Sequence, residues 1–163
     1  MHNILNPLET EKAMKSKEFR SAMGCFITGV TVVTTTDNNK AIGVTANSFS
    51  SVSLEPPLVL WSLSKRSQKH PIMTCVKHYA INMLSKDQEE VAIRFSQSEE
   101  PFLGLDFYFS KLGVPLIKNS VAVLECEQHV IYDGGDHSII LGLVTSFNES
   151  KLEPLTFFRG QLG

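Results

Sequence analysis

The sequence predicts a mainly β fold, an antiparallel β-barrel decorated by two or three helices. Three observations support this prediction. At least seven short runs are rich in β-branched or aromatic residues, short turns rich in Gly, Asn, Asp or Pro separate them, and the helical segments do not alternate regularly with them. Regular alternation would instead indicate a doubly wound parallel sheet.

The N-terminal part is expected to begin with a flexible arm, residues 1–11, followed by an amphipathic helix from Lys12 to Phe26. Apolar side chains recur there at steps of three and four residues, with charged side chains between them, which is the spacing of one helix face. This helix should end near Gly24.

A β-hairpin is expected next. Val30–Thr36 is dense in β-branched residues, and the turn Asp37–Lys40 leads into a second strand, Ala41–Ala46. Two further strands, Phe49–Ser53 and Leu58–Leu63, follow. They are separated by two prolines, which cannot donate to a sheet ladder and therefore belong at a strand boundary.

The middle of the chain is predicted to carry the helices. Ser67–Lys77 is expected to form a short helix, with a proline in its first turn and an apolar face. Tyr79–Leu84 is predicted to be a strand. Ser85 then caps a helix from Lys86 to about Phe95, and Gln88 completes a capping-box pattern.

Residues 96–113 are expected to form an ordered but mobile loop, because their aromatic residues argue against simple disorder. Val121–Tyr132 and His137–Val144 are predicted to be partner strands joined by the hairpin turn Asp133–Asp136. Leu155–Phe158 is the last predicted strand.

Length and composition indicate one ordinary globular domain spanning residues 1–163. Hydrophobic residues make up 42% and charged residues 20% of the chain. The formal net charge of −2 gives no general electrostatic reason to bind nucleic acid or an anionic membrane. The longest apolar runs are much too short to cross a bilayer, and Met1–Lys12 lacks the apolar core of a signal peptide.

The three cysteines, Cys25, Cys75 and Cys126, are far apart and form no CxxC pair. This pattern favours free thiols in a reducing compartment over a disulfide framework or a zinc site, and a cytoplasmic location follows. Each cysteine sits within an apolar pattern, so all three are expected to be buried.

A hydroxyl-rich stretch from Gly43 to Pro57 is the first candidate site. It carries far more Ser and Thr than a turn requires. Small side chains would let a flat ligand approach the backbone, and their polar atoms could form hydrogen bonds with the polar edge of its ring. A serine-rich connection between two strands is the alternative interpretation, and for an isolated cluster it would be the better one.

The second candidate is the basic stretch Leu63–Pro71, with three cations and two hydroxyls at the start of a predicted helix. Free backbone N–H groups and lysine or arginine side chains there favour a phosphate. A solvated basic turn is the alternative. Neither GxGxxG after a strand nor GxxxxGK[ST] occurs, so a nucleotide would not be held in a Rossmann or P-loop manner.

Two isolated polar residues are further candidates. His137 follows a Gly-Gly-Asp turn, which places it at a barrel rim that a ligand could reach, although a surface or capping role is more common. Asn82 lies within an apolar strand and must either satisfy neighbouring backbone or reach a ligand. The histidines show no metal-ligand spacing, so no metal site is expected, and no GxSxG nucleophile elbow occurs.

Several segments resemble, in order, the flavin reductase-like proteins, the short reductases of two-component flavin monooxygenases. Residues 19–35 resemble the opening of that family, and residues 43–58 are very close to its flavin-binding stretch. The remaining matching pieces are Ala80–Ser85 with Gln88, Leu124–Cys126, Gly135–His137, Pro154–Leu155 and Phe158–Gly160. The resemblance covers the chain from about Glu18 to its end.

The resemblance implies a Greek-key split barrel that binds FMN or FAD, usually as a homodimer. It implies that a first group of residues lines the isoalloxazine ring and ribityl chain, a second lies near the phosphate, and His137 lies close to the nicotinamide. Arg159 stands where the family often carries a basic residue, and Gln161-Leu162 replaces an aromatic residue. The first group is Thr45, Ala46, Asn47, Ser48, Ser50 and Ser51, the second is Ser64, Lys65 and Ser67, and Asn82 is added as a cofactor-binding candidate.

The activity implied is hydride transfer from NADH or NADPH to FMN or FAD, which would supply reduced flavin to a separate monooxygenase. Because the flavin carries the chemistry, no protein acid, base or nucleophile is expected. Two alternatives stay open: an electron carrier or sensor that binds flavin tightly without fast turnover, and a binding module that has lost the flavin.

Overall fold

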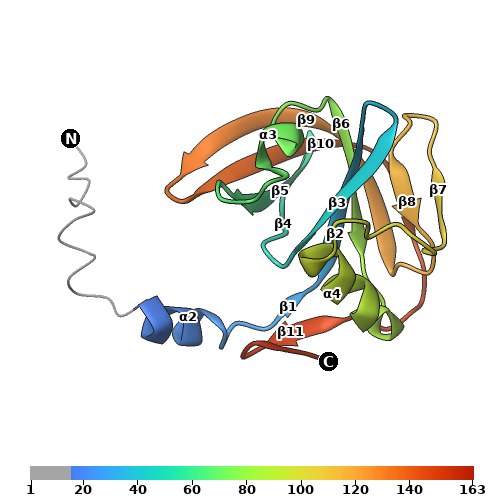
Figure 1. The fold of residues 1–163 in the computed structure, drawn as a ribbon. Coiled ribbons are helices and arrows are strands. Elements are labelled where there is room, and N and C mark those ends of the chain that lie inside the picture. Colours follow the sequence, from blue (N-terminus) through green and yellow to red (C-terminus); the bar gives the residue numbers. More distant parts are fainter. Residues whose placement is uncertain (1–15) are drawn as a thin grey trace, which may run out of the picture.

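The computed structural model describes residues 16–163, and its centre is a seven-stranded antiparallel sheet (Figure 1). The strands lie in the order β3-β2-β6-β9-β10-β5-β4. They are β2 (Thr31–Asp37), β3 (Lys40–Ala46), β4 (Ser50–Leu54), β5 (Pro57–Ser64), β6 (His78–Met83), β9 (Ala122–Gly134) and β10 (His137–Glu149). The predicted mainly β, antiparallel fold is confirmed. The expected arm, 1–11, and the start of the predicted helix at Lys12 lie outside the described residues.

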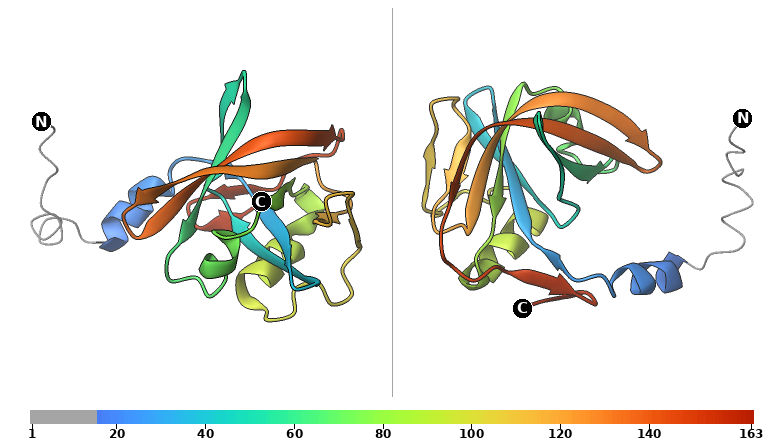
Figure 2. Two further views of the ribbon diagram at one scale, coloured as in Figure 1. Left: turned by 90° about the horizontal axis from the view of Figure 1, so that it is seen from above. Right: turned by 180° about the vertical axis from the view of Figure 1, so that it is seen from behind.

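In the described part of the chain, two small sheets and four helical segments accompany the main sheet. The chain ends pair as β1 (Thr28–Gly29), β11 (Thr156–Phe158) and β12 (Gln161–Leu162), and a separate hairpin joins β7 (Phe107–Phe109) to β8 (Pro115–Ile117). The helical segments are α2 (Ser16–Met23), α3 (His70–Met73), the 3₁₀ turn η1 (Lys86–Gln88) and α4 (Glu89–Gln97). Figure 2 shows α2 standing to one side of the main sheet, beside the C-terminal strands.

The sheet curls around its core without closing into a hydrogen-bonded cylinder. Its edge strands are β3 and β4, and within the described residues no ladder joins them. The loop between them is tied to β5 by Ser48, whose Oγ donates to the Ser62 carbonyl and accepts from the Ser62 N–H, both at 2.9 Å. This side chain therefore closes part of the split that the backbone leaves open.

Among residues 16–163, two large apolar clusters fill the interior, and a third, small one forms around Ala80, Val114 and Leu116. Of the two large clusters, one lies inside the curved sheet and contains Trp61 and Tyr79, whose rings meet edge to face at 6.0 Å. The other lies beneath α4, where Phe95 packs against Gly43, a position at which any Cβ would collide with the phenyl ring. Close packing at Gly43 fixes α4 over β3 and thereby positions the end of β3.

Several elements differ from the sequence-based predictions. The helix expected over Ser67–Lys77 is only the single turn α3, and β10 continues five residues beyond Val144 because its pairing with β9 resumes after a register shift. The segment 96–113 contains β7 and a chain of edge-to-face aromatic pairs from Phe95 through Phe102 to Phe107. Strands β1, β8 and β12 were not predicted.

Candidate functional site

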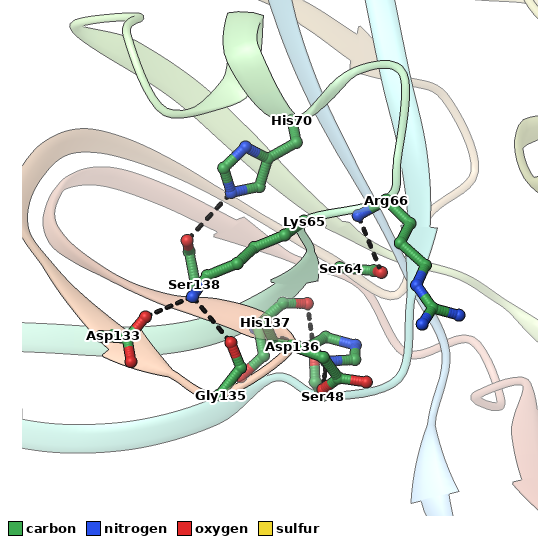
Figure 3. A network of polar contacts seen from close by, with 11 residues as sticks. Ser48, Ser64, Lys65, Arg66, His70, Asp133, Gly135, Asp136, His137 and Ser138 are labelled. Carbon is green, nitrogen blue, oxygen red and sulfur yellow. Dashed lines mark hydrogen bonds and ion pairs between the residues drawn. The ribbon is translucent and has the colours of Figure 1, made fainter.

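One polar cluster forms where β5 ends against the β9–β10 hairpin (Figure 3). Ser64, the last residue of β5, pairs with His137, the first residue of β10. The ammonium of Lys65 donates to the Asp133 carboxylate and, at 2.7 Å, to the Gly135 carbonyl. The Lys65 backbone N–H donates to the Asp136 carbonyl at 2.9 Å. The hairpin turn thus holds both the backbone and the cation of Lys65.

The turn after β5 has the chemistry of an anion site. Ser64 Oγ accepts a hydrogen bond from the Arg66 N–H, and Ser67 Oγ accepts one from the Lys69 N–H, both at 3.3 Å. Two hydroxyls and the Lys65 cation therefore lie within one short turn. Serine hydroxyls and a lysine ammonium are common donors to a phosphate group.

Two carboxylates belong to the same cluster. The Lys65 ammonium donates to Asp133 and holds the pKa of its carboxyl below the usual value. His137 Nδ1 lies 2.7 Å from Asp136 Oδ1, and this contact lowers the pKa of Asp136. The sequence analysis did not name Asp133 as a candidate site residue, because its position in an Asp-Gly-Gly-Asp segment indicates only a hairpin turn.

A second region lies at the end of β3. A groove of about 310 Å³ runs between β3, α4 and the C-terminal strands, and Thr45, Ala46 and Asn47 line it together with Ala92 and Leu162. The Thr45 hydroxyl donates to the Ala92 carbonyl at 2.6 Å, so it fastens β3 to α4. The other side chains that line the groove are mostly apolar, and an apolar lining suits a flat ring.

A larger hollow, of about 760 Å³, adjoins this groove. Asn47, Phe157 and Gly160 line both. The hollow is bounded by the end of α2 and by the β11–β12 turn, and Arg20 and Arg159 lie on its wall. Arg159 has a φ of +50° and places its guanidinium 5.3 Å from the centre of the Phe158 ring.

The predicted residues thus fall into two neighbouring groups. Thr45, Ala46, Asn47 and Arg159 lie at the groove and the hollow, whereas Ser64, Lys65, Ser67 and His137 lie at the end of β5. Ser48 connects the two groups. It follows Asn47 in the chain, and its hydroxyl is hydrogen bonded to Ser62, which lies two residues before Ser64, or roughly 6–7 Å along a strand. Ser50 and Ser51 are exposed at the start of β4, and the Ser50 hydroxyl donates to the Ser51 carbonyl at 3.1 Å.

Asn82 requires a correction, because its side chain is fully buried and its hydrogen bonds are made inside the fold. Its Nδ2 donates to the Val32 carbonyl at 2.9 Å and to Thr34 Oγ1 at 3.0 Å. Its Oδ1 accepts from the Ile117 N–H at 2.8 Å. The amide joins β6 to β2 and β8 and has no surface to offer a cofactor.

The cysteines also differ in part from expectation. All three are free thiols, but only Cys126 is buried, whereas Cys25 and Cys75 are exposed. Within residues 16–163 no group of three or more His, Cys, Asp or Glu side chains could hold a metal ion. In the same part of the chain, no helix combines the length and the apolar character needed to span a bilayer.

Comparison with known families gives a match over most of the chain. The sequence model described as "Flavin reductase like domain" matches residues 23–163. This range contains the groove at the end of β3 and the polar cluster at the end of β5.

Among curated proteins, the chain is 45% identical over 148 residues to FMN reductase (NADH) SmoA of Agrobacterium fabrum, covering 91% of this chain and 85% of that protein. It is 38% identical over 148 residues to the reductase subunit HsaB of a flavin-dependent monooxygenase from Mycobacterium tuberculosis, covering 88% and 79%.

Among solved structures, the NADH:FAD oxidoreductase SgcE6 of Streptomyces globisporus, in complex with NAD and FAD fragments, superimposes with a TM-score of 0.88. The two chains are 36% identical, and the match covers 99% of this chain and 96% of that one. The chain spans about half of a longer protein from Sinorhizobium meliloti 1021, namely 53% of it, at 42% identity, 91% coverage of this chain and a TM-score of 0.89.

Proposed function

The chain belongs to the flavin reductase-like family, and we propose that it passes hydride from NADH or NADPH to FMN or FAD and supplies reduced flavin to a separate monooxygenase. It is an oxidoreductase whose relatives include an NADH-dependent FMN reductase and monooxygenase reductase subunits. The observation that carries the assignment is the pairing of an apolar, ring-sized groove at the end of β3 with a cationic turn at the end of β5.

The residues present fit a flavin. Ala46 and Asn47 would lie along the ring, and Ser64, Lys65 and Ser67 would hold the phosphate of the ribityl chain. Ser50 and Ser51 are exposed at the start of β4 and are kept in the proposal as contacts of the ribityl chain.

A bound flavin would supply the hydride acceptor, so the protein's task is to position two rings and exclude competing reactions. His137 lies beside Ser64 and next to the Lys65 turn, where it would orient the nicotinamide. The Asp136 carboxylate contacts Nδ1 at the edge of this imidazole, which leaves Nε2 for a ligand. No side chain is required to donate or remove a proton in the hydride step.

We further propose a homodimer. Four large apolar side chains on and after α2, namely Phe19, Met23, Phe26 and Ile27, are between 50% and 76% exposed. Monomeric proteins rarely leave such a contiguous apolar surface uncovered, and a second copy of the chain would cover it. A cytoplasmic location is proposed as well, since free, exposed thiols at Cys25 and Cys75 suit a reducing compartment.

The test is oxidation of NADH and of NADPH by the purified protein, with and without added FMN, FAD or riboflavin. Rapid oxidation that saturates with added flavin supports a reductase that treats flavin as a substrate, and it ranks the cofactors. A yellow protein that is reduced once without turnover would instead establish a carrier or sensor. A colourless protein that binds no flavin would refute both assignments.

A further inference from the structure

We propose that His70 is a positioning residue for the turn after β5, and that it acts through a hydrogen bond to Ser138 without touching the ligand. The proposal rests on the proposed function, because Lys65 in this turn is taken to bind the phosphate of the flavin. His70 is the first residue of α3, and its Nε2 lies 2.9 Å from Ser138 Oγ (Figure 3). A serine hydroxyl donates or accepts, so this contact forms with either tautomer of the imidazole.

Ser138 is a polar residue at a buried position. Its exposed fraction is only 6%, and β10 pairs it with the buried Leu63 of β5. Ile140, two residues further along the same strand, is fully buried in the apolar cluster inside the sheet. An apolar side chain would fill this position without needing a partner, whereas a buried hydroxyl needs one. The imidazole of His70 is that partner.

Strand geometry separates this contact from the face that carries the candidate site. Successive side chains of a strand point to opposite faces of the sheet. Ser138 therefore lies on the inner face of β10 and His137 on the other, and the same alternation separates Leu63 from Ser64 on β5. His70 meets β10 on the face opposite to His137 and Ser64, so its effect on a ligand has to pass through the backbone.

The contact gives the turn a second attachment to the β9–β10 hairpin. At the start of the turn, the Lys65 N–H donates to the Asp136 carbonyl at 2.9 Å. At its end, the His70 N–H donates to the Ser67 carbonyl at 3.0 Å, and the His70 ring contacts Ser138. The hairpin thus holds both ends of the turn. Without the second attachment, the lysine and Ser67 would be held from one end only.

The backbone of His70 is fixed independently of its ring. The Thr74 N–H and hydroxyl donate to the His70 carbonyl, at 3.0 and 2.8 Å. The Thr74 carbonyl in turn accepts a hydrogen bond at 3.0 Å from Nε2 of Gln128, a residue of β9. α3 is therefore anchored to the main sheet, and its backbone cannot shift freely to compensate for a shorter side chain at position 70.

Glutamine and asparagine at position 70 distinguish the hydrogen bond from the rest of the imidazole. The side-chain amide nitrogen of glutamine reaches about as far as Nε2 of histidine, whereas that of asparagine reaches only about as far as Nδ1. His70→Gln can therefore keep the contact with Ser138, and His70→Asn cannot. His129→Asn, at an exposed position on β9, is the matched control for the loss of a histidine.

The first measurement is amide hydrogen exchange of the ligand-free full chain, followed by mass spectrometry in peptides that cover residues 64–70. His70→Asn should speed exchange there by roughly fivefold, because one hydrogen bond is lost, and His70→Gln and His129→Asn should change it by less than about twofold. An unchanged rate in His70→Asn would overturn the proposal. No flavin takes part, so the result decides the role of His70 even if the chain bound no flavin and the proposed function failed.

The second measurement is a fluorescence titration with FMN and with riboflavin, which lacks the phosphate. His70→Asn should weaken FMN binding by roughly fivefold and spare riboflavin, and His70→Gln should restore the FMN affinity. An equal loss of both flavins would overturn the proposal, because a merely destabilised fold affects both. Failure of His70→Gln to restore the affinity would overturn it too, since another property of the imidazole would then be required.

A double-mutant cycle tests whether the effect passes through Ser138. Ser138→Ala should weaken FMN as much as His70→Asn does, and the double variant should be no weaker than either single variant. Because Ser138→Ala removes a single oxygen atom, it also provides the comparison if His70→Asn does not fold. Additive losses would overturn the proposal, because they would mean that His70 contacts the ligand directly.

Discussion

Replacement of Lys65 by alanine tests the phosphate assignment most directly. A hydrogen bond between an ammonium and a phosphate is worth about 1.5–3 kcal/mol. The Lys65 side chain is 40% exposed and already donates to Asp133 and Gly135, so binding exchanges one set of contacts for another. The lower end of the range therefore applies, and Lys65→Ala should weaken FMN binding by roughly tenfold.

The assay is a fluorescence titration with FMN and with riboflavin, which has the same ring and no phosphate. Lys65→Ala should weaken FMN and spare riboflavin, while Lys111→Ala, the control for loss of a lysine, should spare both. Asp133→Asn should act in the opposite direction, because it frees the ammonium from its present partner and removes a negative charge near the phosphate.

Either of two results would refute this reasoning. An equal loss of FMN and riboflavin affinity would mean that Lys65 supports the fold of the turn or contacts the ring. Unchanged FMN affinity would remove the phosphate from the end of β5.

Four other outcomes are expected. Asn82→Leu should lower the free energy of unfolding by about 3 kcal/mol in urea titrations, because it removes the side-chain acceptor of the buried Ile117 N–H and a donor to both the Val32 carbonyl and the Thr34 hydroxyl. His137→Ala should reduce kcat/KM for NADH more than flavin affinity, and the reverse pattern in stopped-flow data would move this side chain to the flavin. Gly142→Ala should cost about 1–3 kcal/mol, because its Cβ would overlap the Tyr79 hydroxyl, and Tyr79→Phe should restore part of the loss. Burial raises the pKa of the Cys126 thiol to about 12 from 9.0, so stability should fall as pH rises above 9, where only the unfolded chain ionises this thiol, and Cys126→Ala should reduce that slope.

Much of the fold could be predicted, because its hairpins carry turn residues with specific backbone demands. Asn38 and Asn39 occupy positive φ in the β2–β3 turn, and Gly135 does so in the β9–β10 turn. These residues identify their turns from sequence alone, and the β-branched runs beside them identify the strands. The antiparallel class follows from such local signals without knowledge of any distant contact.

The short elements could not be predicted, because they lack such local sequence signals. Strand β1 contains two residues and exists because tertiary folding brings it against β11. Strand β12 also contains two residues and pairs with β11 across a tight turn whose first central residue is Arg159, a residue type that does not mark such a turn in a sequence. The end of β10 beyond Val144 is mostly exposed and carries polar residues, so only its pairing with β9 makes it a strand. Local propensity contains no information about partners that arrive from distant parts of the chain.

The hydroxyl-rich segment shows the same limit at the candidate site. Its composition indicates many polar side chains on small residues, and both a ligand site and a sheet edge in need of closure require them. In the structure the Thr45 hydroxyl is committed to Ala92, and the Ser48 hydroxyl to Ser62. The segment therefore acts first as a scaffold that fixes the groove. In the proposed function, recognition of a charged ligand would depend on cations from other elements, Lys65 after β5 and Arg159 in the last turn. The composition of the segment alone does not separate its scaffold contacts from ligand contacts, because the same small hydroxyl side chains serve both.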